Sequence, residues 1–191
     1  MKRSGPTREE TYVSEAASYL KLAIANSYFG FASMDRSRIL LEERALDSYY
    51  NILFSTVLFW RTYGSWPKKL TLVSHGFKRN RLVDGHCAAI GYPVERVNFI
   101  GINPPGMDQA GTEKADAMRG VQLALGQWAS DPHGVGDELA RKRKQRNVWG
   151  VSQSLFYSEE ERLRSGVSTQ RVESDACTEA LVEGICHLRI L

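Results

Sequence analysis

The feature that most constrains the fold is a pair of short apolar runs separated by one helix-like segment. The runs cover residues 70–73 and 97–100, and their apolar and β-branched residues are typical of buried strands. Residues 77–90 between them have a helical pattern that ends at Gly91, with Pro93 just beyond. A strand, a helix and a second strand in this order predict a parallel pair. We therefore expect an α/β fold with a Rossmann-like, mainly parallel sheet flanked by helices.

The rest of the chain predicts further helices and one more strand. Ser14 suits the N-cap of a first helix, Asp47 or Ser48 can cap a second, and Gly64 with Pro67 would end it. The other expected elements are a helix over 14–27, a strand over 39–41, and helices over 112–128 and 137–146. From about residue 148 no strand pattern is clear. We expect an α/β domain over 1–147 and an irregular or helical tail over 148–191.

Bulk composition excludes several classes of protein. The chain has 191 residues, of which 42% are hydrophobic, and this suits one domain with a genuine core. Its net charge of +3 is small, unlike that of most nucleic-acid-binding domains. The three cysteines form no CxxC pair, which argues against a disulfide framework or a structural zinc site. Residues 1–6 lack the apolar stretch of a signal peptide, and no apolar run could span a bilayer. We expect a soluble, cytoplasmic protein without membrane contact.

Polar residues follow the predicted strands, where parallel α/β sheets bind their ligands. Ser74, His75 and Lys78 follow one strand, and Arg79 or Arg81 could join Lys78 in holding an anion. The alternative, favoured on residue types alone, is that the serines only cap helices and the basic residues form a solvated face. The chain has no GxGxxG, GxxxxGK[ST] or GxSxG motif, which counts against a standard dinucleotide dehydrogenase.

Three other groups of residues have a functional and a structural interpretation. His75 could act as a general base, although a histidine in a turn is the commoner case. His86 adjoins Cys87, but neighbouring helix positions point in different directions. The basic run over 141–146 is similar to a nuclear-import signal or a phosphate-binding patch. It lacks interleaved aromatic residues, which favours a solvated helix face over nucleic-acid binding.

Several segments, in order along the chain, resemble the DUF218 family (domain of unknown function 218), and its fungal-type branch most closely. They are Ser4-Gly5, Ser14-Glu15-Ala16, the stretch 43–51, Val73 to Arg81, Asn103-Pro104-Pro105, Asp131-Pro132-His133-Gly134, and 142–147. The resemblance covers about residues 4–147. Bacterial members have histidine where this chain has Lys78, and lysine would supply a fixed positive charge instead.

The resemblance implies a Rossmann-like fold with a site at the strand ends, but no particular reaction. It places the characteristic acidic, amide and basic residues of the family on Glu15, Glu43, Asn51, Ser74 and Arg81. Family members begin with a strand and a glycine-rich turn before the Ser-Gly motif, so we expect the first central strand to be absent here. An exposed sheet edge would follow.

Two functions are consistent with these observations. The first is binding of a nucleotide-like or phosphorylated small molecule, with or without catalysis. Its predicted ligand-binding residues are Glu15, Glu43, Asn51, Ser74, Lys78 and Arg81. The alternative is a non-catalytic interaction module that uses the aromatic residues Trp60, Tyr63 and Trp66. The sequence identifies no cofactor, no metal site and no oligomeric state.

Overall fold

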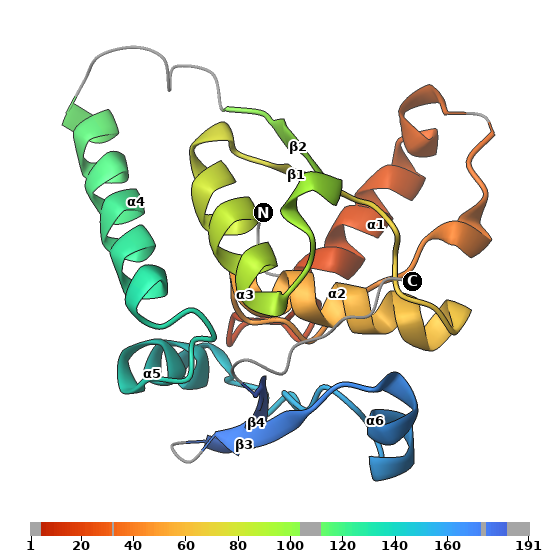
Figure 1. The fold of residues 1–191 in the computed structure, drawn as a ribbon. Helices are drawn as coiled ribbons and strands as arrows, with labels where there is room; N and C mark the ends of the chain where they lie inside the picture. The colour runs from red at the N-terminus through yellow and green to blue at the C-terminus, as the bar shows by residue number, and fades with distance from the viewer. Residues whose placement is uncertain (1–4, 32, 104–111, 173–174, 183–191) are drawn as a thin grey trace.

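The computed structural model describes residues 5–31, 33–103, 112–172 and 175–182 (Figure 1). Ser4 of the Ser-Gly motif, the Pro104-Pro105 pair and residues 183–191 of the predicted tail lie outside this part. The described residues form a mixed α/β fold, as expected. In Figure 1 the β1–β2 pair lies above the long helix α2, and α5, α6 and the β3–β4 hairpin lie below it.

The predicted strand–helix–strand unit is confirmed. Strands β1 (Leu70–Ser74) and β2 (Val97–Gly101) pair in parallel, with Leu70 opposite Val97 and Ser74 opposite Gly101. The connection is helical and runs through η3 (Gly76–Lys78), the π-helical η4 (Asn80–Cys87), α3 (Ala88–Ile90) and the short turn η5 (Val94–Arg96). Gly91 ends α3 with a φ of 78°, a conformation that favours glycine.

The predicted helices are present, with boundaries set by their caps. The remaining helical elements are α1 (Glu15–Ala25), η1 (Ser27–Gly30), η2 (Arg36–Arg38), α2 (Ser48–Tyr63), α4 (Thr112–Ser130), α5 (Asp137–Arg146) and α6 (Glu159–Ser165). The Ser14 hydroxyl accepts a hydrogen bond from the Ala17 N–H, and the Asp47 carboxylate accepts one from the Tyr50 N–H. Gly64 ends α2 with a φ of 69°. Helix α2 supplies much of the core cluster, which also includes Leu72 of β1 and Leu82 and Val83 of η4.

One expected strand is wrong. Residues 39–41 lie between η2 and α2 and are not part of a strand. Leu40 remains 37% exposed there. A strand requires a hydrogen-bonded partner, and a three-residue apolar run does not specify one. The parallel sheet of the described residues therefore contains only β1 and β2, with no long Rossmann-type sheet.

Residues after 148 contain strands that the sequence pattern did not reveal. Strands β3 (Thr169–Val172) and β4 (Asp175–Leu181) pair antiparallel, with a register shift between Arg171 and Val172. Leu155, Val167 and Leu181 belong to the same core cluster as α2. The polar Thr178 is fully buried in β4, so burial there does not follow the apolar pattern that marks a strand in sequence. Whether residues 1–147 form a domain without this part stays a prediction.

Two apolar surfaces remain uncovered by the described residues. Val73 and Ile100 lie on the face of β1–β2 away from α2, and they are 57% and 44% exposed. Helix α1 has no buried residue at all, although its sequence is largely apolar. Among the described residues, no helix has both the length and the hydropathy to cross a membrane.

Candidate functional site

A cavity of about 310 Å³ opens at the start of α2, where four segments distant in the sequence meet. The start of α2, the helical connection after β1, the second half of α4, and α5 each form part of its wall. We call it the basic cavity. Its lining residues are Asp47, Ser48, Lys78, Arg81, Gly120, Leu123, Ala124, Gln127, Trp128, Leu139, Lys142 and Arg146.

Positive charge dominates this lining. Lys78, Arg81, Lys142 and Arg146 contribute cations, and the carboxylate of Asp47 is the acidic group among the lining residues. That carboxylate is already engaged, because Asp47 Oδ2 accepts a hydrogen bond of 2.8 Å from Arg143 Nε. Its other oxygen caps α2. The cavity therefore presents a net positive charge to any ligand.

Among the cations that line the cavity, Arg81 has a buried hydrogen-bond donor that lacks an acceptor in the described part of the chain. Its Nε is buried and has no hydrogen-bond partner among the described residues. Burial lowers the pKa of Arg81, although the nearby Asp47 charge opposes this effect. A buried, unpartnered donor on a charged group costs free energy that an anionic acceptor in the cavity would recover.

Helix α5 turns two residues of the basic run toward this cavity. Lys142 Nζ donates to Gln127 Oε1 at 2.8 Å and to Glu138 Oε1 at 3.1 Å, which holds its ammonium group at the wall. Arg146 follows one helical turn later and also lines the cavity. Arg143 points inward and is 1% exposed. The solvated-face interpretation therefore fits only part of the run, such as Arg141 and Lys144.

A group of rings holds the start of α2 against α4 beside the cavity. The Ser48 hydroxyl and His86 Nε2 lie 2.9 Å apart, and the His86 ring contacts Trp128 edge-on. Trp128 in turn stacks on Tyr49, whose hydroxyl lies 2.8 Å from His133 Nδ1. These contacts hold together two of the helices that line the cavity.

Burial of both side chains argues against a catalytic couple of His86 and Cys87. Burial lowers the pKa of His86 to about 3, so its ring is neutral at physiological pH. Burial also raises the pKa of Cys87 to about 12, which keeps its thiol protonated and unreactive. The described residues contain no cluster of His, Cys, Asp or Glu that could hold a metal ion.

Two of the six predicted site residues share the basic cavity. Lys78 and Arg81 line the basic cavity together. Asn51 and Ser74 are buried, at 3% and 7% exposure. Glu15 is the first residue of α1. Lys142 and Arg146 are lining residues that the sequence did not assign to this site, and their separation of one helical turn was the available signal.

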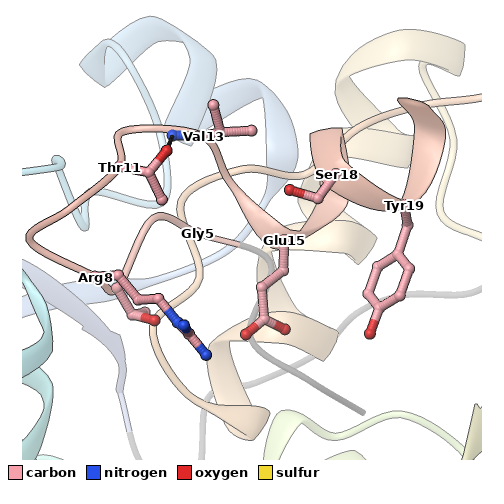
Figure 2. Close-up of a pocket in the computed structure, with 8 residues that line it drawn as sticks. Gly5, Arg8, Thr11, Val13, Glu15, Ser18 and Tyr19 are labelled. Atoms are coloured by element: carbon pink, nitrogen blue, oxygen red, sulfur yellow. Dashed lines mark hydrogen bonds between the residues drawn. The ribbon is translucent and has the colours of Figure 1, made fainter. Parts of the chain in front are cut away.

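Glu15 lines a second cavity of about 350 Å³ with Arg8, Thr11 and Tyr19 (Figure 2). The side chains of Arg8 and Glu15 extend to the same side in this view. One oxygen of the Glu15 carboxylate, Oε2, is buried without a hydrogen-bond partner among the described residues. Glu43 is exposed nearby, and its Oε1 accepts a hydrogen bond of 2.6 Å from the Ser14 hydroxyl.

The fold and the basic cavity together define a mixed α/β protein with a cationic site at a helix start. The chain is similar to the uncharacterized protein YOR238W of Saccharomyces cerevisiae, with 29% identity over 138 residues. The match covers 68% of this chain and 46% of the yeast protein, so the chain spans about half the length of this relative. No family model and no solved structure matches the chain.

Proposed function

We propose that this protein binds a phosphorylated small molecule in the basic cavity. The observation that carries the proposal is the buried, unpartnered Nε of Arg81 in a cavity also lined by Lys78, Lys142 and Arg146. A phosphate group offers several anionic acceptors at once, and arginine recognises such groups with its planar fork of donors.

The start of α2 adds to this preference for an anion. Backbone N–H groups at the first turn of a helix carry partial positive charge, and Ser48 lies there at the cavity wall. The Ser48 hydroxyl is held by neutral His86, so its orientation is fixed before a ligand arrives. The proposal concerns binding, and it includes no reaction.

The family membership and the cellular location that we expect from the sequence belong to the same proposal. We propose that the chain is a divergent member of the DUF218 family with a Rossmann-like arrangement, and that it acts in the cytoplasm. The parallel β1–β2 pair with its helical crossover supports such an arrangement. Lys78 and Arg81 follow β1, in the stretch that carries part of the resemblance.

The interaction-module alternative receives less support from its aromatic residues. Trp60 is buried and stacks on Trp66, which itself packs against the core. Tyr63 is half exposed and contacts Phe59. These rings offer a partner little contiguous apolar surface.

The proposal predicts that inorganic pyrophosphate stabilises the protein through the basic cavity. A ligand that binds only the folded state raises the melting temperature by mass action. Lys78→Ala and Arg146→Ala should each weaken pyrophosphate binding about tenfold, as expected when one charge-assisted hydrogen bond is lost. Isothermal titration calorimetry and a thermal-shift series at low salt would measure both effects.

Arg79→Ala is the matched control for these variants. Arg79 belongs to the same helical connection, but it pairs with Asp84 on the surface and does not line the basic cavity. Pyrophosphate affinity should therefore be unchanged in Arg79→Ala. An absence of binding to the unmodified protein, or equal losses in all three variants, would refute the basic cavity as the anion site.

A further inference from the structure

The basic cavity has a neighbour of different character. A second space of about 530 Å³ adjoins it at Arg81 and Trp128, the two residues that line both cavities. Small and apolar side chains line most of it, among them Ala88, Ala89 and Leu125. We call this space the apolar cavity. Both volumes fall within the range of roughly 300–1,000 Å³ that is usual for small-molecule sites.

We propose that the two cavities hold one ligand, a nucleoside diphosphate or a closely related nucleotide. This inference rests on the proposed function, because it places the phosphates in the basic cavity. The nucleoside part then occupies the adjoining apolar cavity. The arrangement of a cationic half and an apolar half at one wall fits a ligand with the same two halves.

Arg81 stands at the junction of the two halves. It lines both cavities, and its buried Nε has no partner among the described residues. A guanidinium group is planar, so it donates hydrogen bonds to a phosphate at its edge while its face stacks on an aromatic base. A lysine at this position could supply only the charge.

The rim of the apolar cavity favours a nucleoside over a saturated chain. Asn80 and Asp84 line this cavity together with the alanines. An amide side chain can pair with the edge of a base, and a carboxylate can accept hydrogen bonds from ribose hydroxyls. Asp84 also pairs with Arg79 at 3.0 Å, but a carboxylate has room for further donors. A saturated chain would use neither group.

Calorimetry with pyrophosphate, ADP and a short alkyl diphosphate tests this inference. We expect ADP to bind about tenfold or more tightly than pyrophosphate, because the nucleoside adds contacts in the apolar cavity. Ala88→Phe should fill part of that cavity, since Ala88 is an exposed lining residue, and should remove the ADP advantage without changing pyrophosphate affinity. Ala25→Phe, at an exposed position of α1, is the matched control and should change neither affinity.

The outcomes separate this inference from the proposed function. If pyrophosphate does not bind, the proposed function fails, and this inference fails with it. The inference alone is overturned if pyrophosphate binds but ADP binds no more tightly than pyrophosphate. It is equally overturned if Ala88→Phe lowers the affinities for ADP and pyrophosphate by the same factor. It is also overturned if the alkyl diphosphate gains as much as ADP and Asn80→Ala leaves ADP affinity unchanged.

Discussion

Asp47 and Arg143 show how single residues hold this site together. Asp47 caps α2 with one oxygen and binds Arg143 with the other. Arg143 also donates from Nη2 to the Gly134 carbonyl at 2.8 Å, and its guanidinium lies 4.3 Å from the centre of the Tyr50 ring. A Cβ on Gly134 would lie 2.7 Å from Arg143 Nη2 and 2.8 Å from Trp128, so this position has room only for glycine.

These contacts give a structural reason for motifs that the resemblance singled out. In Asp131-Pro132-His133-Gly134, the Asp131 carboxylate accepts hydrogen bonds from the N–H groups of Val135 and Gly136. Asn147, at the end of the later stretch, exchanges two hydrogen bonds with the Val151 backbone. The motifs therefore position α5 and the loops around it.

Removing one partner of the buried Asp47–Arg143 pair should strongly destabilise the fold. Arg143→Met leaves the Asp47 carboxylate buried without its cation, and such losses typically cost about 3–5 kcal/mol. The free energy of unfolding, measured with urea, should fall by this amount. Arg79→Ala breaks an exposed pair and should cost no more than about 1 kcal/mol. Similar losses in the two variants would contradict the burial of the Asp47–Arg143 pair.

Among the elements, α1 and α2 differ in what they contribute to the core. Both carry many apolar residues, but α2 has nine buried positions whereas α1 has none. Helix α2 packs between the β1–β2 unit and the C-terminal hairpin, where Tyr50 donates to the Glu179 carbonyl at 2.8 Å. Helix α1 is held mainly through its start, near Glu43 and the Ser14 cap.

Truncation of one leucine in each helix should reveal this difference. Leu53 of α2 is 1% exposed, and Leu53→Ala should cost about 2–5 kcal/mol through lost burial and a new cavity. Leu22 of α1 is 53% exposed, and Leu22→Ala should change stability by no more than about 0.5 kcal/mol. Urea unfolding of both variants measures the difference. A large loss in Leu22→Ala would mean that α1 is covered in solution.

At the scale of the whole molecule, His86 joins three parts of the fold. It lies in η4, contacts Ser48 at the start of α2, and packs edge-on against Trp128 of α4. Its pKa is lowered to about 3 because burial penalises the charged ring, an effect that the Asp47 charge only partly opposes. The folded state therefore keeps His86 neutral where the unfolded chain would bind a proton.

This difference predicts that acid weakens the fold before most carboxylates titrate. The folded pKa of His86 lies below the unfolded value of 6.5, so its contribution is complete above that pH and is lost as the pH falls toward 3. Well below pH 6.5, the loss approaches about 1.4 kcal/mol per pH unit. Urea unfolding between pH 6.5 and 5 should show this slope.

His86→Gln and His75→Gln test the assignment of the slope. His86→Gln should be less stable at neutral pH but should lose the pH dependence in this window. His75→Gln replaces a partly exposed ring, and this variant should keep the pH dependence of stability. A slope that persists in His86→Gln would show that another group titrates.

The sequence by itself determined the elements whose signals are local. The caps at Ser14 and Asp47 and the glycine stops at Gly64 and Gly91 mark helix boundaries, because each cap depends on neighbours within one helical turn. The β1–β2 unit was also predictable, since each strand is a compact apolar run with helical pattern between them. In the predicted site, the shared cavity of Lys78 and Arg81 follows from their spacing of one helical turn.

Tertiary structure alone decided which distant segments meet. No described residue pairs with residues 39–41 as a strand, and nothing near β4 in the sequence shows that Thr178 is buried. The basic cavity exists because α4 and α5 return to the start of α2, which brings Lys142 and Arg146 beside Arg81. Contacts between residues so far apart depend on packing of the whole core, and no local pattern encodes them.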